Sequence, residues 1–250
     1  MQNYVQQQNN IKGEFLIMCT SFIHRGQDII IGMNFDNNGM RYTIDTKNPK
    51  WFTVLVDGGR GSYPSFGVDR LGRFFNNLVV NSNGKGLYKR ASKKVTHTTK
   101  LIEDILNDVI CVEKLGEYLN NIEVVNTPNC SSHNMICDSS ANVWVVEPGR
   151  GNIYNPAKSS QFFVMTNSSL WDNLNENSEC DCIRFKTITS LLEKAKQVNV
   201  ETAFSMLDTV SQRNGEWITA VSMVYSKNLN TVHYCLNGNF NERFEYKFLE

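Results

Sequence analysis

The chain has 250 residues, of which 41% are hydrophobic and 20% charged, and this composition supports one substantial core. Lys plus Arg equals Asp plus Glu at 25 each, so no overall electric field would attract nucleic acid or an anionic membrane. The longest apolar runs are strand-sized, far short of the roughly 20 residues that a membrane span requires. We therefore expect a soluble protein that recognises a small molecule in a local pocket.

Neither the N-terminus nor the cysteines indicate export. No basic region followed by a long apolar stretch opens the chain, so the sequence lacks the pattern of a secretory signal. The 7 cysteines are an odd number at irregular spacings, which argues against a disulfide framework and for a reducing compartment. We expect a cytoplasmic location.

Residues 1–18 differ in kind from the rest of the chain. They form a polar tract rich in Gln and Asn, with nothing to bury before Phe15. The tripeptide Lys12-Gly13-Glu14 can be encoded by AAA-GGA-GAA, a purine run resembling a bacterial ribosome-binding site upstream of Met18. We interpret the segment as a leader, a propeptide or an extension produced by a misplaced start, followed by one catalytic domain over residues 19–250.

Hydrophobic periodicity predicts many strands and a few clustered helices. The first two strands, Glu14 to Ile23 and Asp28 to Asp36, flank Gly26 and read as a hairpin. Further strands are expected at Phe52 to Val56, Phe74 to Val80, Asn134 to Asp138, Val143 to Glu147, Phe162 to Met165, Trp217 to Tyr225, Thr231 to Cys235 and Arg243 to Phe248. Helices are expected at Thr99 to Cys111, Val112 to Leu119, Ile183 to Val198 and Glu201 to Val210. Runs of strands with helices clustered between them predict an α+β fold with antiparallel sheets.

Five sequence segments occur in an order that resembles a known family. Cys19 follows Met18, and Gly32 to Asp36 reads G-x-N-x-D at the spacing of the next hairpin strand. The other four are Tyr63 to Gly67, the pair Met135 to Asp138 with Val145 to Glu147, Val164 to Asn167, and Ile183 to Phe185. In these segments the chain resembles the choloylglycine hydrolase family of N-terminal nucleophile (Ntn) hydrolases, which includes bile salt hydrolases and penicillin V acylases. The resemblance spans almost the whole chain.

The resemblance implies a four-layer αββα sandwich and the hydrolysis of a linear carbon–nitrogen amide bond in an N-acyl compound, with no cofactor and no metal. Cys19 would be the nucleophile and its own α-amine the base, because an amine with a pKa of ~7.7 to 8.0 accepts a thiol proton near neutral pH. Asp36 would orient the ammonium group, and Arg184 would favour the thiolate by its fixed charge. The side chain of Asn167 would donate to the oxyanion.

Three departures from the family pattern limit what the resemblance implies. The residue aligned with the second oxyanion asparagine is Val79, flanked by Asn77 and Asn81, which share its parity on a regular strand; we prefer Asn81. Met33 stands where bile salt hydrolases and penicillin V acylases usually carry arginine, whereas acyltransferase relatives tolerate other residues there. The stretches after Asp36 and between Asn167 and Arg184 are short, so neither the substrate nor the oligomeric state carries over, and a homo-oligomer stays open.

Simpler interpretations exist for each candidate residue. A cysteine near an N-terminus is usually a small buried hydrophobe, and Asp36 precedes Asn37, Asn38 and Gly39 as a turn residue would. Arg184 reads equally as a surface charge at a helix start, and Asn167 as a turn residue before two serines.

Other classes of site have weaker signals. The set Cys130, His133, Cys137, Cys180 and Cys182 does not match a zinc-site spacing. His24, His97 and His233 lack the neighbours of a Cys–His protease. An acyltransferase that passes the acyl group to an amine, and a non-catalytic binding relative, remain as alternatives to the hydrolase.

Overall fold

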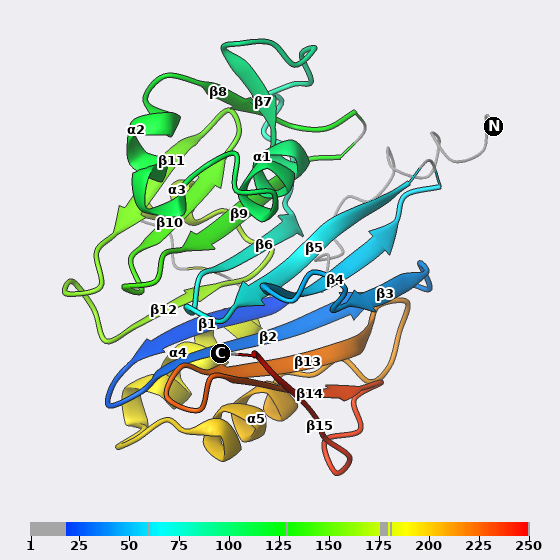
Figure 1. Ribbon diagram of the computed structural model, residues 1–250, viewed down its shortest axis with the longest axis vertical. Coiled ribbons are helices and arrows are strands. Elements are labelled where there is room, and N and C mark those ends of the chain that lie inside the picture. Colours follow the sequence, from blue (N-terminus) through cyan, green and yellow to red (C-terminus); the bar gives the residue numbers. More distant parts are fainter. Residues whose placement is uncertain (1–18, 60, 129, 176–179, 181, 250) are drawn as a thin grey trace.

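Two antiparallel sheets pack face to face between two layers of helices (Figure 1). The computed structural model describes residues 19–59, 61–128, 130–175, 180 and 182–249. This architecture confirms the predicted α+β sandwich. The expected leader, residues 1–18, lies outside the described residues.

The six-stranded sheet carries the opening hairpin at its centre, in the order β12-β1-β2-β13-β14-β15. Its strands are β1 (Thr20–Arg25), β2 (Ile29–Asn37), β12 (Phe162–Met165), β13 (Ile218–Ser226), β14 (Thr231–Leu236) and β15 (Phe244–Lys247). Helices α4 (Ile183–Lys194) and α5 (Val200–Thr209) pack on its outer face, where Phe22, Ile188 and Phe204 share one apolar cluster.

The seven-stranded sheet has the order β11-β10-β9-β6-β5-β4-β3. Its strands are β3 (Tyr42–Asp45), β4 (Trp51–Asp57), β5 (Ser62–Asp69), β6 (Phe74–Val79), β9 (Ser132–Cys137), β10 (Val143–Glu147) and β11 (Gly151–Asn155). Helices α1 (Thr98–Leu106) and α2 (Leu115–Leu119), with the 3₁₀ turn η2 (Val112–Lys114), cover its outer face (Figure 1). The remaining elements are the short helix α3 (Leu170–Asn175) and a parallel pair, β7 (Val95–His97) with β8 (Glu123–Val125).

Strand alternation assigns each apolar side chain to one of three cores. On β6, Phe74 and Leu78 belong to the core between the sheets, whereas Phe75 belongs to the cluster under α1. Burial of large aromatics on both faces explains why these strands read as nearly continuous apolar runs in the sequence.

Most predicted elements are present, with differences at their ends. The helix expected to reach Cys111 ends at Leu106, and the left-handed backbone of Asp108 (φ 56°) stops it from continuing. The helix expected to reach Val198 ends at Lys194, and Val198 packs into the outer cluster from a loop. Strands β3, β5, β7, β8 and β11 and helix α3 were not predicted, and Tyr63 to Gly67 lies within β5. No helix of the described residues is both long enough and apolar enough to cross a membrane.

Candidate active site

The opening hairpin brings the first two predicted site residues together. Cys19 directly precedes β1, and Thr20 pairs with Asn34 in β2, so the end of β2 lies beside Cys19. The Asp36 main-chain N–H lies 3.4 Å from Cys19 Sγ, and the thiol lies 3.8 Å from the Asp36 carbonyl oxygen. Cys19 is buried, with 7% of its surface exposed.

Each residue of the G-x-N-x-D segment has a separate physical role. A Cβ at Gly32 would lie 2.4 Å from the Phe22 ring, so only glycine lets that ring pack across the hairpin. Asn34 donates from Nδ2 to the Leu207 carbonyl and accepts from the Ser222 hydroxyl, which ties β2 to α5 and β13. Of the three residues, only Asp36 contacts the thiol, so the motif contains two structural residues and one site residue.

Asp36 is held by partners from two distant segments. Thr219, at the start of β13, donates from Oγ1 to Asp36 Oδ1 at 2.6 Å. Arg184, the second residue of α4, places Nη1 3.7 Å from Asp36 Oδ2. Among the described residues, Oδ2 accepts no hydrogen bond although it is buried. The carboxylate therefore retains acceptor capacity within the site.

Arg184 links α4 to the first residues of the hairpin. Its Nη1 donates to the Cys19 carbonyl oxygen at 2.6 Å and to Thr20 Oγ1 at 2.9 Å. The guanidinium is buried against these groups, so the interpretation of Arg184 as a surface charge is wrong.

Burial dominates the electrostatics of the site. Burial, together with the nearby Asp36 carboxylate, raises the pKa of the Cys19 thiol to about 12, and the Asp36 N–H and the Arg184 charge only partly oppose it. Burial also raises the pKa of Asp36 to about 6, against the Thr219 hydrogen bond and the Arg184 charge. The Cys19 thiol is therefore almost entirely protonated at neutral pH.

Asn167 lies in the segment between β12 and α3. Its Nδ2 donates to the Val79 carbonyl oxygen at 2.7 Å, and its buried Oδ1 has no hydrogen-bond partner among the described residues. Asn167 thus joins the end of β6 to the segment that follows β12, the strand paired with β1. Its side chain is a tertiary anchor rather than a free turn residue.

The two other asparagines considered for the oxyanion are Asn77, which lies on β6, and Asn81, which lies beyond its end. Asn77 donates to Thr99 of α1 at 3.5 Å, so it faces the helix layer. Val79 is two residues after Asn77, so its side chain points to the same face of the sheet. Its partner on β9, Ser132, has a hydroxyl that bonds to Thr98 of the same helix, which is consistent with that direction. Asn81 lies two residues beyond the last residue of β6 and is exposed, and its carbonyl oxygen accepts from Arg150.

Sequence reasoning missed two polar residues of the site, Thr20 and Thr219. Both are buried and hydrogen-bond to predicted site residues. Threonine is common on strands, so neither residue type is a signal by itself. Thr20 was recognisable only as the neighbour of Cys19, and Thr219 pairs with Asp36 across 183 positions.

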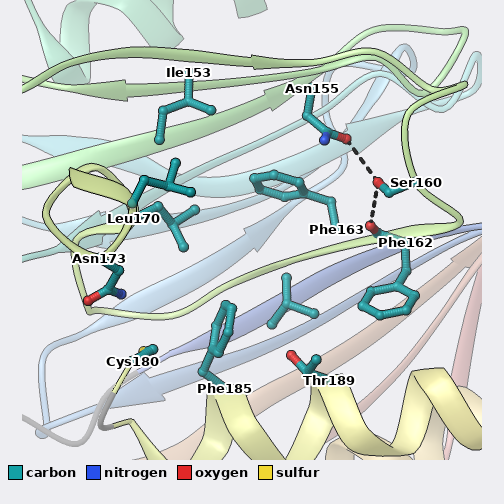
Figure 2. A pocket seen from close by; sticks show the side chains of 12 residues that line it. Ile153, Asn155, Ser160, Phe162, Phe163, Leu170, Asn173, Cys180, Phe185 and Thr189 are labelled. Carbon is teal, nitrogen blue, oxygen red and sulfur yellow. Dashed lines mark hydrogen bonds between the residues drawn. The ribbon is translucent and has the colours of Figure 1, made fainter. Parts of the chain in front are cut away.

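A cavity of about 430 Å³ lies at the open edge of β12. Figure 2 shows Phe185 and Thr189 of α4 opposite Phe163 of β12, with Leu170 of α3 alongside. Phe185 adjoins Arg184 in sequence, but Cys19 does not line this cavity. The hollow therefore lies next to segments of the candidate site without containing the thiol.

Solved structures share the fold of this chain. The chain is similar to a mutant of the conjugated bile acid hydrolase from Clostridium perfringens, with a TM-score of 0.65, 16% identity and 92% of each chain covered. It is also similar to penicillin V acylase from Agrobacterium tumefaciens, with a TM-score of 0.61, 16% identity and coverage of 87% of this chain and 83% of that chain. A third similar structure is the Caenorhabditis elegans ortholog of N-acylethanolamine-hydrolyzing acid amidase, with a TM-score of 0.58, 15% identity and coverage of 82% of this chain and 92% of that chain.

No protein-family model and no curated protein sequence matches the chain. At these low identities the structural similarity establishes the fold. The chain has the expected αββα sandwich, and these solved structures share its fold.

Proposed function

We propose that the chain is an amidase that cleaves a linear carbon–nitrogen bond of an N-acyl compound, with Cys19 as its nucleophile. The observation that carries this proposal is the convergence of Cys19, Asp36 and Arg184 in one buried cluster, although the last two are 148 positions apart, by 184 minus 36. The shared fold supports the reaction class, because the similar structures are named as hydrolases or acylases of conjugated bile acids, penicillin V and N-acylethanolamines.

The base in this mechanism is the α-amine of Cys19 after residues 1–18 have been removed. A free amine with a pKa of ~7.7 to 8.0 accepts the thiol proton, whereas a peptide nitrogen cannot. The buried Asp36 Oδ2 retains a free acceptor position for the resulting ammonium group. Arg184 adds a fixed positive charge that favours the thiolate.

The reaction then proceeds in two halves. Cys19 sulfur bonds to the amide carbonyl carbon, and the carbon–nitrogen bond breaks as the ammonium of Cys19 gives its proton to the departing nitrogen. Water next attacks the thioester with the same amine as base, releasing the carboxylic acid and restoring the thiol.

Asn167 is the proposed side-chain donor to the tetrahedral oxyanion. Its Nδ2 currently donates to the Val79 carbonyl, so the amide has a second proton to offer to an oxyanion. Removal of one such donor typically lowers kcat by ~10²- to 10³-fold, and we expect this loss in Asn167→Ala. Asn81 stays the predicted second donor.

The decisive test compares two forms of the same chain. A protein that starts at Met18 and loses that methionine should release free amine from a panel of conjugated bile acid, penicillin V and N-acylethanolamine. A form that retains residues 1–18, verified by intact mass, should not. Cys19→Ala should be inactive in both forms. Cys111→Ala, which changes an exposed cysteine, should leave the activity of the trimmed form unchanged.

The same assay separates the alternatives. Equal turnover by trimmed and uncut protein would eliminate the N-terminal nucleophile mechanism. Formation of a new N-acyl product when a second amine is added would identify an acyltransferase. Substrate binding without turnover by the trimmed protein would identify a non-catalytic relative.

A further inference from the structure

A buried carboxylate holds the segment that carries Asn167. Glu147, the last residue of β10, accepts from the Ser169 hydroxyl at 2.6 Å and from the main-chain N–H groups of Leu170 at 3.0 Å and Trp171 at 3.2 Å. These donors are consecutive and begin two residues after Asn167. One side chain from the seven-stranded sheet thus fixes the chain between β12 and α3.

His133 completes the arrangement from the neighbouring strand β9. Its Nδ1 lies 2.9 Å from Glu147 Oε1, and both side chains have 0% exposure. Burial opposes ionisation of Glu147, but hydrogen bonds from His133, Ser169 and Leu170 hold its pKa below the usual range. An ionised carboxylate only accepts, so the shared proton lies on His133 Nδ1.

Stability alone gives little reason for this arrangement. Burial of an ionised carboxylate costs desolvation free energy, and a serine at the Ser169 position is itself a sufficient helix cap. Ser169 already accepts from the Asp172 N–H at 3.0 Å. The additional buried carboxylate is explained better by a need for exact placement of the segment.

We propose that Glu147, kept in place by His133, is a positioning residue for Asn167. Asn167 is then fixed on both sides, by Val79 through its own amide and by Glu147 through the three residues that begin at Ser169. This inference rests on the proposed function, because it assigns Glu147 the task of holding an oxyanion donor. It also goes beyond that function, since Glu147 and His133 contact neither Cys19 nor Asp36 in any described interaction.

The test uses two reactions of Cys19 that differ in one respect. Amide hydrolysis passes through an oxyanion, whereas alkylation of the thiol by iodoacetamide does not. In Glu147→Gln one acceptor oxygen becomes an NH2 group that faces the donors of Ser169, Leu170 or Trp171, so the segment that carries Asn167 shifts. A small misplacement of a catalytic group costs up to ~10²-fold in rate, so we expect kcat to fall ~10- to 100-fold. The KM should stay within about 2-fold of the wild-type value, and the rate of thiol alkylation should not change. The main-chain amides of Leu170 and Trp171 should exchange hydrogen faster.

Two further variants separate positioning from a loss of folding. Asp138→Asn turns one acceptor oxygen of a comparable carboxylate into a donor. Asp138 accepts from the Ser140 and Asn142 main-chain N–H groups at the opposite end of the β9–β10 hairpin, and its substitution should leave kcat unchanged. If Glu147→Gln does not fold, Ser169→Ala provides a milder change that should lower kcat in the same direction.

A double-mutant cycle gives the sharpest outcome. Once Asn167 is replaced by alanine, adding Glu147→Gln should lower kcat by less than about 2-fold, because the group to be positioned is gone. Independent losses that multiply, equal losses of hydrolysis and alkylation, or full activity of Glu147→Gln would each overturn the inference. A trimmed wild-type protein that hydrolyses no amide would instead refute the proposed function itself.

Discussion

Replacement of Asp36 by asparagine should stabilise the uncut chain at neutral pH while removing its potential for catalysis. The pKa of Asp36 rises from 3.8 to about 6 in the fold, chiefly because the carboxyl is buried. The pKa differs by about 2 units between the unfolded and the folded state. At 1.36 kcal/mol per unit, ionisation of this carboxyl lowers the free energy of unfolding by about 3 kcal/mol. Asparagine resembles the neutral acid and avoids that loss.

The sign of the effect sets its pH window. Because the folded pKa exceeds the unfolded one, the folded state binds the proton more tightly, and wild-type stability falls as pH rises from about 3.8 to about 6. Asp36→Asn should therefore match wild type near pH 3.5 and exceed it by about 3 kcal/mol at pH 7.5.

Urea unfolding at both pH values measures this difference, with the exposed Glu216→Gln as the matched control. A variant less stable than wild type at pH 7.5 would refute the reasoning, since Arg184 and Thr219 would then contribute more than burial costs. In trimmed protein the gap should narrow, because the proposed ammonium of Cys19 would favour the carboxylate.

The remaining predictions concern the neighbours of Asp36 and Cys19. Arg184→Ala removes the charge that lowers the pKa of Cys19, so alkylation of the trimmed protein at pH 7.5 should slow about 10-fold or more, measured by intact mass. Thr219→Val removes the 2.6 Å hydrogen bond to Asp36, which should cost about 1 to 3 kcal/mol in urea unfolding at pH 7.5 and less at pH 4, where the carboxyl is protonated. Asn81→Ala should lower kcat if its amide serves the oxyanion, and an unchanged kcat would assign the second donor to a main-chain N–H.

The sequence was sufficient for the parts of the site that depend on local geometry. A hairpin of known length places Asp36 beside Cys19, so a two-strand pattern predicts that contact directly. Arg184 carries no such signal, because a cation at a helix start is usually exposed. Its place at the Cys19 carbonyl followed only from the family resemblance, and the described contacts place it there.

Other features could not be read from the sequence because their partners are distant or their residue types are common. Thr219 reaches Asp36 from a strand 183 positions away, and threonine is ordinary on any strand. His133 drew attention only as a weak metal candidate, whereas its Nδ1 bonds to Glu147. The strand expected over Phe74 to Val80 ends one residue earlier, at Val79, so Asn81 lies outside it.

The burial of Cys19 has a consequence for how the nucleophile is activated. Because burial raises the pKa of the Cys19 thiol to about 12, very little of the thiol is ionised at neutral pH. Within the described site the ionisable neighbours are Asp36, whose negative charge disfavours the thiolate, and Arg184, which cannot accept a proton. The main-chain nitrogen of Cys19 is always within reach of its own sulfur, and it becomes basic only when the preceding peptide bond is absent. The proposed activity thus depends on removal of residues 1–18, because only then does Cys19 carry a free amine that can accept the thiol proton.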